Sequence, residues 1–328
     1  MSEESRYRWL GASILGAAAL GAGLAGGWVW LGGDEQATDE AIAMGTEPFR
    51  VPELEFVEAE SSAALLAELR ERGNKQWLPE EQVAPVTARA FPPDLPELEV
   101  SKRKELFFRV LMPMVLAENA RLREARAFVE QAFERREALS EAEQQRLAEI
   151  AEHYRVDLDA EDAEQRLLRR VDEVAPAMAL AQAANESGWG TSRFTRKANN
   201  LFGEWTWTDE GLVPEQREEG KTHRVRLFPS LQHSVRSYIY LLNVGHSYQD
   251  LRAQREALRQ DGEPLDGEAL SEGLEAYSER GSEYVEEIQS MIRFNDLDQV
   301  ADLRLQPTDR VPLKELVQAE AEAEALEE

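Results

Sequence analysis

The feature that most constrains the fold is an alanine-rich segment between Pro176 and Ser187. Proline is favoured in the first turn of a helix and alanine is the strongest helix former, so we expect a helix that begins at Pro176. Its small side chains allow neighbouring elements to approach closely, which is typical of a central, buried helix. Gly188 and Gly190 follow at once and are expected to end the helix. This pattern predicts a mainly α-helical domain built around the segment.

Glu186 lies at the C-terminal end of this expected helix, with Gln182 one turn earlier on the same face. A carboxylate at that end meets an unfavourable helix dipole, and burial beside aromatic side chains would add a desolvation cost. Both effects favour the neutral acid and should raise the pKa of Glu186. A carboxyl group that keeps its proton near neutral pH can protonate a glycosidic oxygen. Glu186 is therefore the candidate catalytic acid.

Aromatic and amide side chains crowd the residues around and after Glu186. Flat rings can stack on the apolar faces of pyranose sugars, and amides can form hydrogen bonds with hydroxyl or N-acetyl groups. The alternative, in which the same rings pack in the core near a glycine-rich turn, stays open. On this pattern we predict the following substrate-binding residues: Gln182, Trp189, Asn200, Phe202 and Trp205.

The run ALAQAANESGWGTSRFTRKANNLFG closely resembles the glucosaminidase domain of Bax-type proteins. These are related to the flagellar and autolysin N-acetylglucosaminidases of glycoside hydrolase family 73, in the lysozyme-like superfamily. The resemblance continues through FPSLQHSVRSYIYLLN and GLEAYSERGSEYVEEIQSMIR, and covers roughly residues 100 to 300. It implies a helical, lysozyme-like fold with a small β-hairpin lobe, and cleavage of β-1,4 bonds between amino sugars.

The resemblance also implies roles for two residues. The glutamate of the ESGWG-type motif is the catalytic acid in that family, and it corresponds here to Glu186. The tyrosine of the late AYS-type motif corresponds to Tyr277, which is expected to line the cleft beside the reacting sugar. A core tyrosine beneath a helix end is the alternative for Tyr277.

A second carboxylate is harder to assign. Glycosidases usually pair an acid with a base or a nucleophile, and in several relatives a glutamate of the β-lobe is proposed for that role. Four residues of the expected lobe are candidates, although each is also compatible with a solvated charge: Glu204, Glu215, Glu218 and Glu219. Assistance by the substrate's N-acetyl group, or a mechanism with a single glutamate, also remains open.

Three functional hypotheses follow. The first is an endo-β-N-acetylglucosaminidase that hydrolyses the glycan strands of peptidoglycan, with Glu186 as the general acid. The second is a lytic transglycosylase that uses the same glutamate and leaves 1,6-anhydromuramic ends. The third is a non-catalytic envelope protein that binds glycan or serves as a scaffold, and envelope protein partners are not identified by the sequence.

Composition excludes several other functions. With 64 acidic and 37 basic residues the net charge is −27, which disfavours binding to nucleic acid. The chain has no cysteine, so it has neither disulfides nor thiolate chemistry. Its four histidines are dispersed without metal-ligand spacing, so we expect no metal and no organic cofactor.

The N-terminus suggests a location. Residues 9–33 carry no charge and are long enough to cross a bilayer, which takes about 20 residues. Arg6 and Arg8 precede the segment, so the positive-inside rule places the N-terminus in the cytoplasm. We expect a single-pass protein of the bacterial inner membrane, with the catalytic domain in the periplasm. A cleaved signal peptide is the alternative.

These patterns divide the chain into five parts. Residues 1–33 are the expected membrane anchor and 34–100 an acidic, proline-rich tether. Helical spacing and a capping box at Ser140 and Glu143 predict a helical hairpin over residues 101–170. Residues 171–302 are the glucosaminidase-like catalytic domain, and 303–328 an acidic tail.

Overall fold

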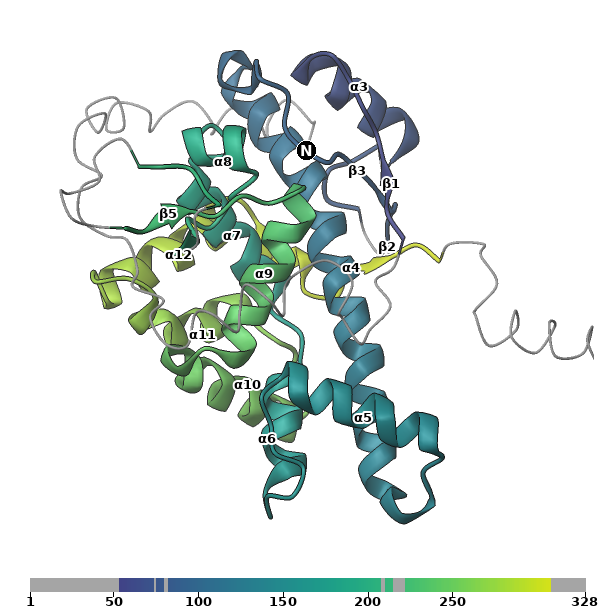
Figure 1. The fold of residues 1–328 in the computed structure, drawn as a ribbon. Helices are drawn as coiled ribbons and strands as arrows, with labels where there is room; N and C mark the ends of the chain where they lie inside the picture. Colours follow the sequence, from purple (N-terminus) through teal and green to yellow (C-terminus); the bar gives the residue numbers. More distant parts are fainter. Residues whose placement is uncertain (1–52, 74, 80–81, 208–209, 215–221, 308–328) are drawn as a thin grey trace, which may run out of the picture.

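The computed structural model describes residues 53–307, except 74, 80–81, 208–209 and 215–221 (Figure 1). The described chain is mainly helical, and its strands are two residues long and paired two by two. This arrangement is consistent with the expected lysozyme-like class. The helices are α3 (Ser62–Arg72), α4 (Val100–Glu134), α5 (Glu141–His153), α6 (Ala163–Arg170), α7 (Pro176–Ser187), α8 (Arg193–Ala198), α9 (Leu231–Val244), α10 (Gln249–Asp261), α11 (Gly267–Ser271) and α12 (Ser282–Phe294). The strands are β1 (Glu55–Phe56), β2 (Gln82–Val83), β3 (Val86–Thr87), β4 (Trp205–Thr206), β5 (Arg224–Val225) and β6 (Arg304–Leu305).

The long helix α4 runs through the molecule (Figure 1). Glu99 caps its first turn, because the Glu99 carboxylate accepts hydrogen bonds from the backbone N–H groups of Ser101 and Lys102. Pro113 removes one backbone hydrogen bond inside the helix. The helix nevertheless continues past it, since residues 106–119 are buried on all sides by α7, α9 and other elements.

The predicted helical hairpin is present as α4 and α5. Ser140 and Glu143 form the expected capping box, in which the Ser140 hydroxyl accepts from the Glu143 backbone N–H and the Glu143 carboxylate accepts from the Ser140 backbone N–H. However, the first half of α4 packs against α7 and α9 of the predicted catalytic domain. The hairpin therefore consists of the second half of α4 together with α5, whereas the first half of α4 belongs to the core of the predicted catalytic domain.

The prediction of an extended tether over residues 34–100 is wrong for its described part. Residues 53–99 fold onto α4 through α3, β1 and β3, and their buried apolar side chains join the main core. Strand β1 pairs in parallel with β3. Composition was misleading because the prolines and acids separate these apolar residues, which are Leu54, Val57, Leu65, Leu66, Leu69, Val83, Val86, Phe91 and Leu95.

The predicted C-terminal tail also begins inside the fold. Strand β6 pairs in parallel with β2, with Gln82 opposite Arg304 and Val83 opposite Leu305. The buried Leu303 precedes this strand. Residues 34–52 and 308–328 lie outside the described residues, as does the predicted membrane anchor over residues 1–33. None of the described helices combines the length and apolar character needed to cross a bilayer.

Helix α7 is the expected central helix. It begins at Pro176, and every residue from Pro176 to Ala184 is buried against α4, α11 and α12. The packing is close enough to require small side chains, since a Cβ atom added to Gly267 of α11 would lie 2.7 Å from the Cβ of Ala177. This close approach explains the alanine-rich sequence.

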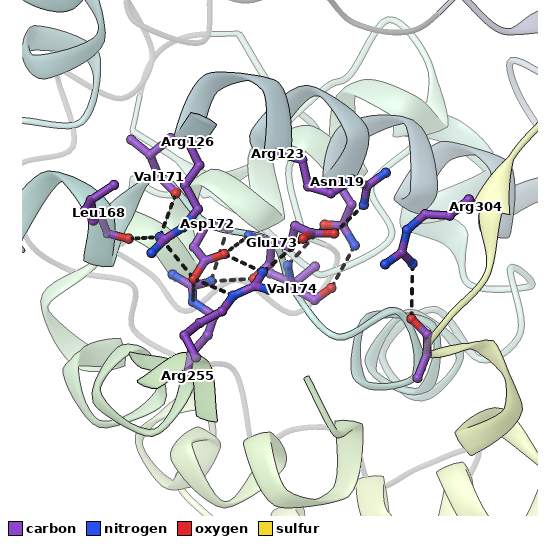
Figure 2. A network of polar contacts seen from close by, with 12 residues as sticks. Asn119, Arg123, Arg126, Leu168, Val171, Asp172, Glu173, Val174, Arg255 and Arg304 are labelled. Atoms are coloured by element: carbon purple, nitrogen blue, oxygen red, sulfur yellow. Dashed lines mark hydrogen bonds and ion pairs between the residues drawn. The ribbon is translucent and has the colours of Figure 1, made fainter. Parts of the chain in front are cut away.

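A buried polar network fixes the segment that leads into α7 (Figure 2). Asp172 is 2% exposed, and its carboxylate pairs with the guanidinium groups of Arg126 and Arg255 at 3.4 and 3.5 Å. The Asn119 side chain of α4 bonds to the backbone of Val174 in both directions, at 2.8 and 3.1 Å. The N-terminal end of α7 is thereby held to α4 and α10, which in turn fixes where its C-terminal end lies.

Candidate active site

Glu186 occupies the last turn of α7, where the chain leaves the core. Gly188 ends the helix in the left-handed conformation, with φ of 55°, as the sequence predicts. Gly190 is also left-handed, and a Cβ atom at this position would lie 2.9 Å from both Leu95 and Phe91. The turn after Glu186 therefore needs glycine for its backbone conformation and for its packing against the 53–99 segment.

The Glu186 side chain is partly exposed and receives one hydrogen bond, which the Tyr284 hydroxyl of α12 donates to Oε1 at 2.8 Å. Burial raises the pKa of the Glu186 carboxyl from 4.5 to about 7, and the negative charge of Glu287 adds to the rise. The hydrogen bond from Tyr284 and the positive charge of Arg280 oppose it. Glu186 therefore holds its proton near neutral pH, as a general acid must.

A chain of hydrogen bonds between buried side chains connects α9 to Glu186. The Tyr238 hydroxyl of α9 donates to Gln182 Oε1 at 2.5 Å, and Gln182 Nε2 donates to the Tyr284 hydroxyl at 2.9 Å. Tyr284 then donates to Glu186. Gln182 is completely buried, so its described contacts orient tyrosines and do not offer its amide to solvent.

Tyr277 lies directly beside this chain. Its ring stacks on that of Tyr284, with centroids 5.3 Å apart and an interplanar angle of 13°. Its hydroxyl donates to the backbone carbonyl of Phe202 at 3.4 Å. The side chain is 5% exposed, so Tyr277 is close to Glu186 but reaches it through Tyr284.

Two of the other predicted substrate-binding residues are buried near the β-lobe, which is the antiparallel pair of β4 and β5. Asn200 is 1% exposed, and its side-chain amide bonds to the backbone of Glu204 in both directions, at 2.8 and 2.9 Å. Phe202 is also buried and stacks on Tyr238, with ring centroids 3.9 Å apart.

The two predicted tryptophans differ in their surroundings. Trp189 adopts a positive φ of 60° and packs edge-on against Phe107 and Phe108 of α4, while the ammonium group of Lys104 lies 4.4 Å from its ring centroid. These contacts make Trp189 an anchor of the turn after α7. Trp205 lies in β4, partly exposed, with its ring centroid 3.7 Å from that of His223.

Of the four candidates for a second carboxylate, one lies within the described residues. Glu204 is 3% exposed: its Oε2 accepts from the Ser237 hydroxyl at 2.6 Å and lies 3.7 Å from the guanidinium of Arg226. These contacts tie the β-lobe to α9. Glu215, Glu218 and Glu219 lie outside the described residues. Across the described ranges, no group of three or more metal-ligating acids and histidines is placed to hold a metal ion.

Comparison with known proteins identifies the family to which the chain belongs. Residues 162–297, from α6 to the segment after α12, match the glucosaminidase family, described as mannosyl-glycoprotein endo-beta-N-acetylglucosaminidase. Protein bax of Escherichia coli (strain K12) is 32% identical over 186 residues, which cover 56% of this chain and 66% of that relative. This chain is a Bax-type glucosaminidase-domain protein. No solved structure matches it significantly.

The glucosaminidase domain implies an enzyme of the glycoside hydrolase type that acts on a glycan. The matched residues contain α7, β4, β5, α9 and α12, and therefore Glu186 and the hydrogen-bonded chain of Tyr238, Gln182 and Tyr284 that leads to it. The long helix α4 and the 53–99 segment precede the matched residues. They support the domain from outside it.

Sequence reasoning missed several residues of this site. No sequence pattern assigns a role at this site to Tyr238, Tyr284, Arg280 or Glu287. Tyr284 is separated from Gln182 by 102 residues and from Glu186 by 98, so no local spacing could reveal these contacts. The available signal was the polar, aromatic start of α12, which follows directly on the AYS motif of the family.

Proposed function

We propose that this Bax-type glucosaminidase-domain protein is an endo-β-N-acetylglucosaminidase that hydrolyses β-1,4 bonds in the glycan strands of peptidoglycan. Glu186 is the general acid in this proposal. The observation that carries it is a single carboxyl group, partly exposed at a helix end, whose pKa is raised to about 7 and whose Oε1 is fixed by Tyr284. An acid of this kind is suited to protonating a leaving sugar at neutral pH.

The hydrogen-bond geometry suggests which oxygen carries the proton. Tyr284 donates to Oε1, so the proton of neutral Glu186 belongs on Oε2. In the reaction Oε2 gives this proton to the glycosidic oxygen while the bond from that oxygen to the anomeric carbon breaks. Water then adds to the anomeric carbon and releases a proton to the solvent. The resulting Glu186 carboxylate is stabilised by the Tyr284 hydroxyl until it is protonated again.

The test uses the full chain with purified peptidoglycan, and mass spectrometry to identify the new ends. Reducing N-acetylglucosamine ends are the expected product. A Glu186→Gln variant should leave the strands intact, while Glu286→Gln, which removes an exposed carboxylate from α12, should cut normally. Intact strands after incubation with a folded, wild-type chain would overturn the proposal.

A lytic transglycosylase is the second candidate, and the environment of Glu204 favours it. A base or nucleophile must reach the anomeric carbon or its attacking water, whereas Glu204 is 3% exposed and bonded to Ser237. A transglycosylase needs no attacking water, because the muramic 6-hydroxyl closes on its own anomeric carbon. The same mass spectrometry separates the two, since this reaction leaves 1,6-anhydromuramic ends.

We also propose that the N-terminal segment anchors the protein in the inner membrane, with the glucosaminidase domain in the periplasm. The support is the uncharged stretch over residues 9–33, which is preceded by Arg6 and Arg8. Protease added to spheroplasts should digest the domain if it faces the periplasm. Protection of the domain in intact spheroplasts would refute this orientation.

A further inference from the structure

The start of α12 places a positive charge beside the proposed acid. Arg280 precedes α12, and the backbone at Gly281 takes a positive φ of 54° as the helix begins. The Arg280 guanidinium carbon lies 5.6 Å from the centroid of the Tyr284 ring, whose hydroxyl bonds to Glu186. Arg280 and Glu186 are also close enough to interact electrostatically. A guanidinium group, paired with Glu287, therefore lies near the carboxyl group that would protonate the leaving sugar.

Arg280 is accessible and keeps free hydrogen-bonding capacity. Its side chain is 42% exposed, and its Nη2 pairs with the carboxylate of Glu287 one helical turn beyond Tyr284. Among the described residues this is its one side-chain hydrogen bond, out of five N–H donors on a guanidinium group. Glu287 thus holds the guanidinium in place without occupying all of its donors.

The strongly negative net charge of the chain indicates what a guanidinium at the position of Arg280 could bind. At −27 the chain repels anions in general, so an acidic ligand gains from a local cation at its binding site. Guanidinium groups recognise carboxylates through directed, charge-assisted hydrogen bonds. A neutral glycan would have no group that needs such a partner.

We propose that Arg280 is a specificity-determining residue that binds a carboxylate of the glycan, so that the substrate is an acidic, muramic-acid-containing strand and not a neutral glycan. This inference rests on the proposed function, because it assumes that the glycan binds across Glu186. The carboxylate belongs either to the lactyl group of a strand without peptides or to a peptide attached to that group. Both sources present the same chemistry to the guanidinium.

The decisive measurement is binding, with the catalytic acid removed so that strands are not cut. Full chains that carry Glu186→Gln are titrated with soluble strands lacking peptides, and with the same strands after their lactyl carboxylates have been converted to amides. A third titration uses strands that keep their peptides. For a partly exposed charge pair, we expect amidation to weaken binding by roughly three- to tenfold, and adding Arg280→Gln to remove this difference.

Matched controls come from the other end of α12. Arg293 pairs there with Glu268 and is similarly exposed, about 20 Å along the helix from Arg280. Arg293→Gln makes the same charge change and should leave the preference for acidic strands intact. Glu287→Gln releases Arg280 and should strengthen binding of acidic strands severalfold, whereas Glu268→Gln should not.

The outcomes separate this inference from the proposed function. Equal binding of acidic and amidated strands by the Glu186→Gln chain would overturn the role of Arg280, whether or not the wild-type chain cuts peptidoglycan. A preference that Arg280→Gln abolishes would support it even if no cleavage were found. If only the strands with peptides show the preference, the carboxylate is that of the peptide. No binding of any strand would overturn both proposals.

Discussion

Replacing Glu186 with glutamine should stabilise the protein at alkaline pH while abolishing its activity. In the folded chain the pKa of this carboxyl is about 7, against 4.5 for an unperturbed glutamate. Below pH 4.5 the group is neutral in both the folded and the unfolded state, so its ionisation contributes nothing to the difference in stability between the two chains. Between these values the unfolded chain loses the proton and the folded chain keeps it, which favours unfolding of the wild type.

The size of the effect follows from the two pKa values. The difference between about 7 and 4.5, at about 1.36 kcal/mol per pKa unit, corresponds to a loss of wild-type stability of about 3 kcal/mol above pH 7. This value is an upper limit, because the carboxyl is partly exposed and solvent screens its charge. The Glu186→Gln chain never ionises at this position, and its amide oxygen can still accept the hydrogen bond from Tyr284. It should therefore be more stable than the wild type by up to about 3 kcal/mol at pH 8. For a domain of this size that corresponds to roughly 6–12 °C in Tm.

The assay is urea unfolding of both chains at several pH values from about 4 to about 9, a range that spans both pKa values. The stability difference should be near its baseline at the acidic end, should grow between pH 4.5 and about 7, and should stay constant above that. The exposed-carboxylate control Glu286→Gln should show no such rise. A difference between the Glu186→Gln chain and the wild type that does not change with pH would refute the raised pKa, and with it the electrostatic basis of the proposed acid.

Three further substitutions test the surroundings of the site. Tyr284→Phe removes the hydrogen bond that lowers the pKa of Glu186, so the alkaline limb of the pH–activity profile should move to higher pH. Because Glu186 also loses a contact that positions it, kcat should fall by up to about a hundredfold. An unchanged pH profile would contradict the hydrogen bond between Tyr284 and Glu186. Trp189→Ala should lower the free energy of unfolding in urea by about 3 kcal/mol, because the ring packs on Phe107, and should leave KM nearly unchanged. A large rise in KM with unchanged stability would instead make Trp189 a sugar-binding residue. Glu204→Gln breaks a buried ion pair with Arg226 and should destabilise the protein by roughly 3–5 kcal/mol. The kcat per folded molecule should stay within a few fold of the wild-type value. Loss of kcat in a stable variant would instead identify Glu204 as the second carboxylate.

The part of the fold that local sequence rules govern could be predicted. Pro176 at the start of α7, the left-handed Gly188 at its end and the capping box at Ser140 all depend on residues within a few positions of one another. The direction of the Glu186 pKa shift could also be predicted, and its leading cause is burial, one of the two effects that the sequence indicates. Such features need no knowledge of distant segments.

The parts that failed depend on distant partners. Residues 53–99 resemble a tether because β1 and β2 are two residues long, too short for an alternating pattern, and β2 finds its partner far along the chain, at Arg304. The predicted sugar-binding role of Gln182 rested on its position one turn from Glu186. That position is correct, but the buried amide contacts Tyr238 and Tyr284, which belong to two other helices.

The polarity of Gln182 shows why these distant contacts matter for chemistry. Its Oε1 accepts a hydrogen bond from the Tyr238 hydroxyl, which leaves Nε2 facing Tyr284 as a donor. The Tyr284 oxygen therefore accepts from Gln182 and must direct its own proton elsewhere, toward Glu186. If the amide were reversed, Tyr284 would donate to Gln182 and Glu186 would lose the contact that fixes its Oε1. With Tyr238 as the donor at its far end, the chain runs in one direction through Gln182 and Tyr284 to Oε1 of Glu186, and leaves Oε2 as the oxygen that carries the proton.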